Sequence, residues 1–292
     1  MLGLGFTKTN ENWPKEVTHA RIWDIGATWK DIHVAPDQYN WARLDEVMAK
    51  MEGMGYKHIT YVIAATPQWL AKYPTQAHFA LWLGPGTNSM PHNVEEFNKF
   101  VHNLATRYKG RIHAYEIWNE PQLADFLYPY DIKELNTLAT MTKRAYKTIK
   151  SIDSKALVLG ASILPRPTSG GMKKAKKYLD AMKEKGYPVD AWTCHIYPVG
   201  NTNQGELWKQ YFDETRAALK GRKTSKLWVT ETGLGLLQGP ISPEKTEKYL
   251  NKIKDVAKGT FVYWYAWDRP DLGGALIAEG TPAWNTIKKR WK

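Results

Sequence analysis

The fold is constrained most strongly by a regular alternation of strand-forming runs with helical patterns along the chain. Several of the β-rich runs lack the polar alternation of a half-exposed strand, as expected for strands buried on both faces of a parallel sheet. The eight runs are Leu2–Phe6, Ala20–Ile25, Lys57–Ala64, Ile112–Trp118, Ala156–Ala161, Ala191–Ile196, Lys226–Thr230 and Phe261–Trp267. The pattern therefore predicts one parallel sheet.

Helical patterns lie between these runs. Apolar residues from Leu44 to Met54 recur at the 3.6-residue spacing of one helix face, so the methionines among them are expected in the core. The connection Thr7–Thr18 is too short for a full helix, which predicts only a stub there. Other helices are expected at Val94–Tyr108, Ile132–Ile149, Lys173–Lys185, Leu207–Leu219, Pro243–Val256 and Pro282–Trp291.

Strands and helices that alternate without a Gly/Ser/Pro-rich linker predict an α/β fold, a single (β/α)8 TIM barrel over residues 1–292. Barrels of this kind often form a single domain of about this length. The longest connection, Thr66–Asn93, carries Trp69 and Trp82, so it is expected to form part of a cleft wall.

Composition narrows the possible functions. The net charge of +12 permits contact with an anionic surface, but alone it does not indicate nucleic-acid binding. The densest basic run, Lys173–Lys177, fits the solvated face of a helix. Cys194 is the only cysteine, and the histidines form neither His-x-His nor His-Glu-x-x-His. No intrachain disulfide, metal site or organic cofactor is therefore expected.

Targeting signals are not visible. Residues Met1–Lys8 lack the basic and continuous apolar segments of a signal peptide. No run of about 18 apolar residues exists, so no membrane span is expected. Three interpretations of location stay open, namely a cytoplasmic chain, one released by lysis, or one cut from a longer precursor. A monomer is expected.

Side chains that can act as acids, bases or ligand contacts occur where several of the strands end. In a (β/α)8 barrel the strand ends form the reactive face. Glu120 follows Asn119 after one strand, and Glu231 closes another. Glycoside hydrolysis uses such a pair of carboxyl groups across the scissile bond. Glu116, four residues before Glu120, is expected to be a barrel-interior carboxylate held by Arg or His.

Several motifs resemble those of the retaining (β/α)8 glycoside hydrolases of clan A, nearest to families 39 and 5. The resemblance rests on Arg21–Gly26, Tyr39–Trp41, Thr66–Trp69 and Trp118–Pro121, and it extends over essentially the whole chain. It implies that the strand-end glutamate after Asn, Glu120, is the acid/base and that Glu231 is the nucleophile.

The residue types suit these roles. Partial burial beside Trp118 and a second carboxylate would raise the pKa of Glu120, as a general acid near neutral pH requires. Glu231 must instead stay ionised, and Arg21 and Tyr197 are the candidate donors to it.

Further residues are expected to contact the sugar. Asn119 suits the 2-hydroxyl, whose contacts strengthen in the transition state. Trp267, with Trp264 as the alternative, is expected under the reacting ring. His195 fits either a core histidine or a ligand contact. The remaining substrate-binding candidates are Asp24 and Trp69.

The sequence thus indicates a retaining β-glycoside hydrolase that acts on a polysaccharide or oligosaccharide, such as a cell-wall polysaccharide. Connections that mostly look short favour endo action, because they would leave a groove open at both ends. An exo-acting β-glycosidase or a transglycosylase would use the same two glutamates. The alternative of another class is a catalytically silent carbohydrate-binding barrel, against which the presence of both glutamates, Asn119 and Tyr197 argues.

Overall fold

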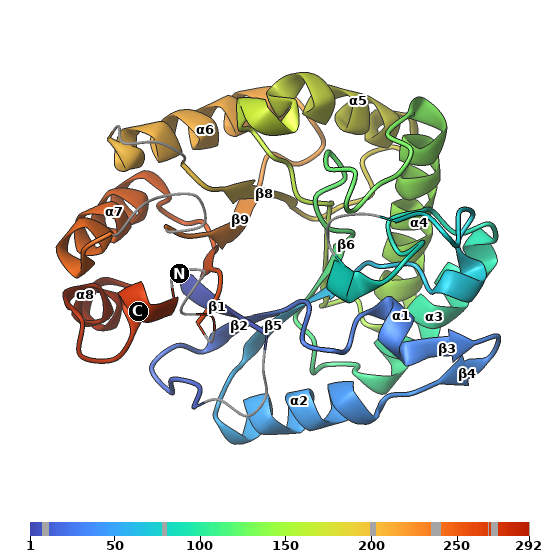
Figure 1. The fold of residues 1–292 in the computed structure, drawn as a ribbon, viewed down its shortest axis with the longest axis horizontal. Helices are drawn as coiled ribbons and strands as arrows, with labels where there is room; N and C mark the ends of the chain where they lie inside the picture. The colour runs from blue at the N-terminus through green and yellow to red at the C-terminus, as the bar shows by residue number, and fades with distance from the viewer. Residues whose placement is uncertain are drawn as a thin grey trace.

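The computed structural model describes residues 1–7, 12–77, 81–198, 203–234, 241–267, 269 and 274–291. An eight-stranded parallel sheet curves into a barrel with the helices in a ring around it (Figure 1). All the predicted strands are present, which confirms the (β/α)8 fold. They are β1 (Leu2–Phe6), β2 (His19–Ile22), β5 (His58–Ile63), β6 (Ala114–Ile117), β7 (Leu157–Leu159), β8 (Trp192–Ile196), β9 (Leu227–Thr232) and β10 (Val262–Trp264).

The outer helices begin and end within a few residues of the predicted positions. Asn93 before α3 and Asp131 before α4 accept hydrogen bonds from first-turn amides, which would otherwise lack partners. Residues 12–18, the described part of the first connection, contain no helix; a full helix is absent there as expected, but the predicted stub is absent from these residues as well. The helices are α2 (Ala42–Gly53), α3 (Val94–Arg107), α4 (Ile132–Ile152), α5 (Gly171–Glu184), α6 (Gln204–Leu219), α7 (Pro243–Val256) and α8 (Pro282–Arg290).

The sequence did not indicate a small hairpin between β2 and α2. The buried His33 ring stacks on Tyr39 with 4.6 Å between centroids, so a tertiary contact rather than a local periodicity supports this element. It consists of α1 (Trp29–Ile32), β3 (His33–Ala35) and β4 (Gln38–Tyr39). Short 3₁₀ turns occur elsewhere at η1 (Gln68–Leu70), η2 (Leu81–Leu83), η3 (Pro167–Ser169) and η5 (Gly274–Ile277).

The barrel has a seam between β7 and β8. Neighbouring strands pair in the order β7–β6–β5–β2–β1–β10–β9–β8, whereas β7 and β8 form no ladder and are joined by isolated bridges at Leu159 and Ile163. Asp190, just before β8, supplements these bridges. Its carboxylate accepts a 2.8 Å hydrogen bond from the Val158 amide, and its own amide donates one of 2.8 Å to the Val158 carbonyl. The barrel is thus closed without a continuous ladder.

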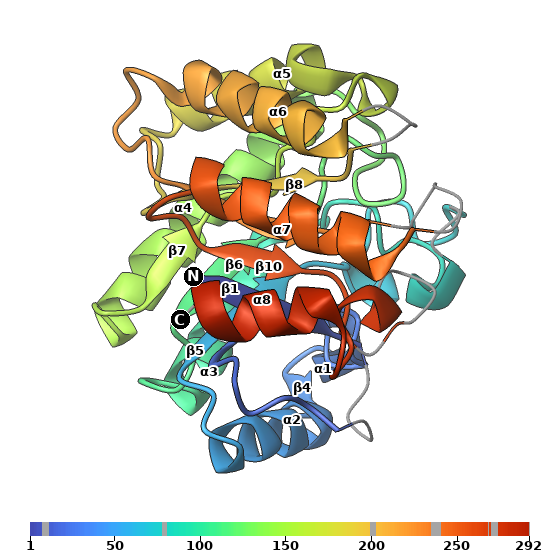
Figure 2. The ribbon, with the colours of Figure 1, turned by 90° about the vertical axis from the view of Figure 1, so that its left-hand side faces the viewer.

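The two ends of the barrel differ. Figure 2 shows both chain termini at the end where the strands begin, so the strand carboxyl ends meet at the opposite end. None of the described helices combines the length and the apolar composition that crossing a bilayer would need.

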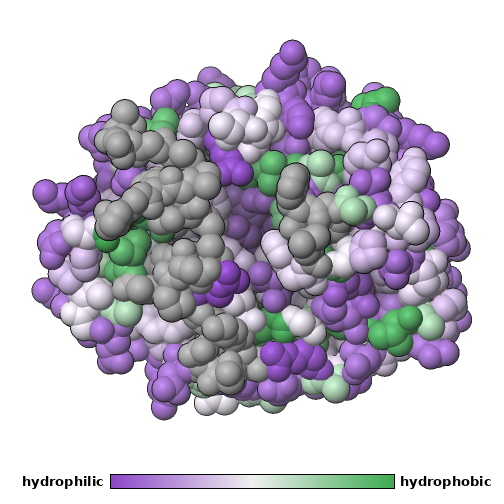
Figure 3. All heavy atoms as spheres, viewed as in Figure 1, coloured by the Kyte–Doolittle hydropathy of each residue, from purple (hydrophilic) through white to green (hydrophobic). Residues whose placement is uncertain are grey.

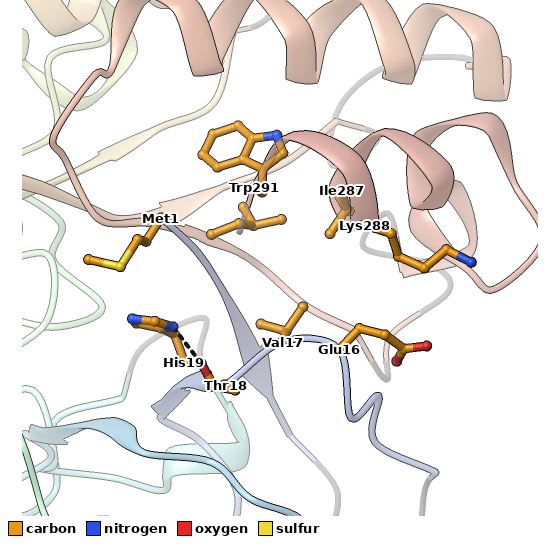
Figure 4. A pocket seen from close by; sticks show the side chains of 9 residues that line it. Met1, Glu16, Val17, Thr18, His19, Ile287, Lys288 and Trp291 are labelled. Atoms are coloured by element: carbon orange, nitrogen blue, oxygen red, sulfur yellow. Dashed lines mark hydrogen bonds between the residues drawn. The ribbon is translucent and has the colours of Figure 1, made fainter.

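Three histidines cover the amino-terminal end of the barrel. His19 and His58, which begin β2 and β5, stack with 4.3 Å between ring centroids, and His113 meets His58 edge-on at 4.9 Å. His19 also lines a cavity of about 320 Å³ beside Lys288 and Trp291 (Figure 4). Burial, and then the neighbouring His58, lower the pKa of His19 to about 4.

This low pKa predicts acid sensitivity of the fold. His19 titrates near 6.5 in the unfolded chain but stays neutral in the folded one, so the unfolded state binds the proton first. The free energy of unfolding is expected to fall by on the order of 2–3 kcal/mol through this group as the pH drops from 6.5 toward 4. Urea unfolding at pH 7 and pH 4.5 measures the change.

His19→Phe should reduce this pH dependence because it removes the titrating ring. His102→Phe, at an exposed position of α3, is the matched control and should keep the wild-type dependence. The same pH dependence in all three proteins would refute a role for His19.

Candidate active site

The carboxyl-terminal end of the barrel gathers most of the side chains that the sequence indicated. In Figure 3 the face turned to the viewer is hollowed at its centre, and hydrophilic residues lie in the hollow and along parts of its rim. Arg21 on β2, Asn119 and Glu120 after β6, His195 on β8 and Glu231 on β9 are all buried or nearly so. Direct hydrogen bonds connect them into one cluster.

Arg21 is the centre of this cluster. Its Nε donates to Glu116 Oε2 at 2.7 Å, and its Nη1 donates to Glu231 Oε1 at 2.6 Å. Its Nη2 donates to Asn119 Oδ1 at 3.0 Å. Burial alone would lower the pKa of Arg21, but the Glu116 and Glu231 carboxylates raise it above its usual value. The charged guanidinium therefore offsets two buried carboxylates from different strands, and the interior position predicted for Glu116 is confirmed.

Glu231 has a donor at each carboxylate oxygen. Arg21 binds Oε1, and the Tyr197 hydroxyl donates to Oε2 at 2.8 Å. Burial, and then the Glu231 charge, hold the pKa of Tyr197 well above its ordinary value, so this hydroxyl stays protonated. The two predicted donors therefore both contact Glu231.

His195 connects Glu120 to the rest of the cluster. Its Nδ1 lies 2.6 Å from Glu120 Oε1, and its Nε2 lies 3.5 Å from Arg21 Nη2. Because an arginine can only donate, Nε2 is the acceptor there and the ring proton is on Nδ1, which donates to Glu120. Burial lowers the pKa of His195 to about 4, so the ring is neutral near pH 7.

Glu120 is the carboxyl group with the strongly altered acidity. Burial raises its pKa to about 7, although the positive charges of Arg166 and Arg21 oppose this rise. A carboxyl group with such a pKa can both give and take a proton near neutral pH.

Glu120 and Glu231 face each other at short range. One oxygen of each carboxylate and one ring nitrogen of His195 lie within 4.8 Å of one another. Three such atoms could hold a metal ion, but the Arg21 guanidinium already contacts Glu231 and would repel a second cation there. The expectation that no metal or organic cofactor is used stays a prediction.

The backbone after β6 turns sharply to present these groups. Trp118 and Glu120 have φ values of 79° and 36°, in the left-handed region that costs a non-glycine residue about 1–3 kcal/mol. Trp118 Nε1 donates to the Phe126 carbonyl at 2.7 Å, and the Glu120 amide donates to Ser162 Oγ at 3.0 Å. These bonds hold the strained turn, and such strain is frequent at functional sites.

Asp24 lies after β2 and is partly buried. Its Oδ2 accepts a 2.7 Å hydrogen bond from the Tyr265 hydroxyl. Burial, and then the Asp24 charge, raise the pKa of Tyr265 well above its ordinary value. A Cβ at Gly5 would come within 2.9 Å of the Tyr265 ring, so glycine at this point of β1 leaves space for it.

The two tryptophans considered as a sugar platform occupy different places. Trp264 is fully buried, and its ring meets Tyr249 of α7 edge-on at 6.3 Å. It is a core residue between barrel and helices rather than a substrate contact, which corrects that expectation. Trp267 is partly exposed, donates to the Asn12 carbonyl at 3.0 Å and packs against Trp284 of α8. Its place under a sugar ring stays a prediction.

Trp69 packs against the hairpin. Its Nε1 donates to the His33 carbonyl at 2.9 Å, and the two rings meet edge-on at 4.9 Å. The described contacts of Trp69 therefore connect it to β3 and not to the cluster around Arg21.

Two polar residues between β7 and α5 were not predicted. Ser162 accepts the hydrogen bond from the Glu120 amide, and it directly follows the predicted strand end at Ala161, a signal that could have identified it. Arg166, whose charge acts on Glu120, lies in a connection without any periodic pattern.

Comparison with protein families identifies a match over most of the chain. The family model described as cellulase (glycosyl hydrolase family 5) matches residues 22–270. This span contains Asn119, Glu120, His195 and Glu231, and Arg21 lies directly before it. No curated protein matches the sequence.

Solved structures share the barrel at low sequence identity. A monomeric beta-xylosidase from Caulobacter crescentus has a TM-score of 0.70 and 17% identity, over 94% of this chain and 61% of that chain. A family 39 glycoside hydrolase from Bacteroides cellulosilyticus has a TM-score of 0.65 and 16% identity, over 98% of this chain and 62% of that chain.

An endo-beta-1,4-mannanase from Thermotoga petrophila has a TM-score of 0.62 and 16% identity, over 94% of this chain and 70% of that chain. At such identities the likeness shows the fold alone. The chain spans about three fifths of the length of the beta-xylosidase and of the family 39 enzyme.

Proposed function

Because the chain belongs to the cellulase family, glycosyl hydrolase family 5, and is a clan A glycoside hydrolase, we propose that it hydrolyses β-linked glycans with retention of configuration. In this proposal Glu231 is the nucleophile and Glu120 is the acid/base. No metal or organic cofactor takes part.

The proposal depends chiefly on the short distance between the two carboxyl groups. Oxygens of Glu120 and Glu231 lie within 4.8 Å of each other. Retaining glycosidases place their carboxyl groups about 5–5.5 Å apart, whereas inverting ones need about 6.5–9.5 Å to admit a water molecule. The spacing therefore supports attack by Glu231 on the sugar itself.

Glu120 supplies the proton in the first step. Its pKa of about 7 keeps a large fraction protonated near neutral pH. Because His195 Nδ1 donates to Oε1, the proton of Glu120 is expected on Oε2, from which it can pass to the glycosidic oxygen. The bond between the anomeric carbon and that oxygen breaks, and the leaving sugar departs as an alcohol.

Glu231 attacks the anomeric carbon from the opposite face and forms a covalent glycosyl-enzyme. Arg21 and Tyr197 hold its carboxylate in position for this attack. In the second step Glu120 takes a proton from water, which displaces Glu231, so two inversions give net retention. Asn119 uses its Oδ1 for Arg21, which leaves its amide hydrogens to donate to the sugar 2-hydroxyl.

A polymeric β-glycan cut at internal bonds is the proposed substrate. Loops that follow β5 and β6 carry exposed aromatic rings, with 42% of Tyr73, 63% of Trp82 and 39% of Tyr128 accessible. Exposed rings of this type can stack on sugars beyond the reacting one. The similar structures include a beta-xylosidase and an endo-beta-1,4-mannanase, so xylan and mannan are the first polymers to test.

Product analysis is the test of this proposal. Xylan, mannan and a soluble β-glucan are incubated with the protein, and new reducing ends are labelled and separated by length. We expect oligosaccharides of several lengths, whereas monosaccharide alone would indicate exo action. If neither the polymers nor their oligosaccharides give new reducing ends, a catalytically silent barrel would be favoured.

The stereochemistry of the product tests the mechanism. Proton NMR in the first minutes of hydrolysis is expected to show the β-anomer before mutarotation, because double displacement retains configuration. An α-anomer that appears first would mean inversion and would rule out Glu231 as a nucleophile.

A further inference from the structure

We propose that Arg166 binds an anionic group on the leaving-group side of the scissile bond, so that the preferred substrate is an acidic glycan. This inference rests on the proposed function, because it takes Glu120 as the group that protonates the leaving oxygen. The chemical class that it names is a carboxylate-bearing sugar, such as a uronic acid.

The segment that carries Arg166 is fixed to the segment that carries Glu120. The Gln122 side chain, which is fully buried, donates from Nε2 to the carbonyls of Leu164 and Gly171, each at 2.9 Å. Gln122 Oε1 accepts from the Leu164 amide at 2.8 Å. Together with the bond from the Glu120 amide to Ser162, these contacts hold the connection after β7 against the turn after β6.

The guanidinium of Arg166 lies near the reacting groups. Its Nε donates to Ser169 Oγ at 2.6 Å, which fixes the side chain along the connection. After burial, its charge is the strongest influence on the pKa of Glu120, stronger than that of Arg21. Its charge also acts on His195 of β8 and on Tyr211 of α6. The connection that carries Arg166 follows β7 at the carboxyl-terminal end of the barrel and is bonded to the turn of Glu120, so the residue belongs to the same face as the two glutamates.

Arg166 lacks an anionic partner in the described part of the chain. Arg21 and Arg107 both form ion pairs with carboxylates, whereas the only side-chain hydrogen bond of Arg166 to a described residue is the one to Ser169. Within the described residues, its Nη1 and Nη2 groups have no acceptor, so they can donate to a ligand. The planar guanidinium matches a carboxylate with two parallel hydrogen bonds, which is the geometry of a specific anion contact.

The position of this cation relative to the two glutamates determines which part of the substrate it meets. Glu231 is held by Arg21 and Tyr197, while Arg166 acts on Glu120. Since the acid/base protonates the leaving oxygen, a cation that acts on Glu120 and is not a partner of Glu231 is placed to meet the leaving sugar. A carboxylate on that sugar would then pair with Arg166.

Kinetics with two leaving groups test this assignment. The 4-nitrophenyl β-xyloside, β-glucoside and β-mannoside first identify a sugar that the protein cleaves. For that sugar, kcat/KM is measured with a 4-carboxyphenyl leaving group and with its uncharged methyl ester. The ratio of interest is kcat/KM for the carboxyphenyl glycoside divided by kcat/KM for its methyl ester. Arg166→Gln is expected to lower this ratio by about tenfold or more, because it removes a charge-assisted contact that only the carboxylate can make. Arg166→Lys should restore part of the ratio.

Arg216→Gln is the matched control, because it removes the same charge from an exposed position in the last turn of α6. It should leave the ratio unchanged. The proposal would be overturned if Arg166→Gln left the ratio unchanged and shifted the alkaline limb of the pH profile to higher pH for both substrates. Arg166 would then only lower the pKa of Glu120.

Binding decides the matter if none of the three glycosides is cleaved, and the polymer digestion described above then shows separately whether the proposed function fails. In affinity electrophoresis, glucuronoxylan should retard the wild-type protein more than the same polymer with its carboxyl groups reduced to alcohols. Arg166→Gln should abolish that difference. Equal retardation of the wild-type protein by both polymers would overturn the acidic-glycan assignment.

Discussion

Replacing Glu231 by glycine is expected to lower kcat on an activated aryl β-glycoside by about 10⁴-fold or more, because the covalent step loses its nucleophile. The substitution leaves a hole on the face opposite the leaving group. Azide can enter there and attack in one displacement, so added azide should restore turnover and give an α-glycosyl azide. The measurement is the rate with and without azide and the anomeric configuration of the product.

Glu120→Ala is the companion variant, because it keeps the nucleophile and removes the proton donor. Substrates with poor leaving groups should fail, while an activated aryl glycoside still forms the covalent intermediate. Azide then attacks that intermediate after a first inversion and gives a β-glycosyl azide. The wild-type protein with azide is the control, and exchanged configurations in the two variants would reverse the assigned roles.

Arg21→Met is expected to lower the free energy of unfolding by about 3–5 kcal/mol, because it leaves Glu116 and Glu231 without their buried counter-charge. Activity should fall as well, since the variant no longer holds Glu231 and Asn119 in position. Urea unfolding at neutral pH measures the loss of stability.

Arg107→Met is the matched control for this loss. Arg107 donates two hydrogen bonds to Asp45, at 2.9 and 2.6 Å, but both side chains are more than a third exposed. Exposed ion pairs contribute up to about 1 kcal/mol, so the control should change stability little. Adding Glu116→Gln to Arg21→Met should recover part of the loss, because it removes one uncompensated charge. If Arg21→Met lowered the free energy of unfolding no more than Arg107→Met does, this account would be contradicted.

The strands could be predicted from the sequence because each is buried on both faces, which leaves a continuous apolar run with turn residues on either side. β1 and α7 have the predicted bounds, and the other strands differ by a few residues at their ends. The hairpin of β3 and β4 could not be predicted in the same way. It depends on His33, which stacks on Tyr39 and lies near Phe100 of α3, and such contacts leave no periodicity in the chain.

The cluster itself could be predicted because its members stand at strand ends, where the fold determines their position. The aromatic run after β10 shows the limit of that reasoning. Successive side chains of a strand point to opposite faces, so a one-residue difference decides between barrel interior and helix layer. Trp264 points to α7, whereas Tyr265 reaches Asp24. Arg166 escaped prediction because only the folded connection brings it near Glu120.

The interrupted pairing of β7 and β8 gives this barrel a property that fully closed barrels lack, namely two sheet edges that face each other. Unpaired edge groups can recruit strands from other chains and so start aggregation. Here β7 has only three residues, and the Asp190 carboxylate occupies the Val158 amide while it pairs with Lys150 at 2.8 Å. The amides of Gly160, Ile163 and His195 also donate to carbonyls across the seam. We therefore expect Asp190, a residue outside the cluster around Arg21, to protect mainly the Val158 position from strand-mediated self-association.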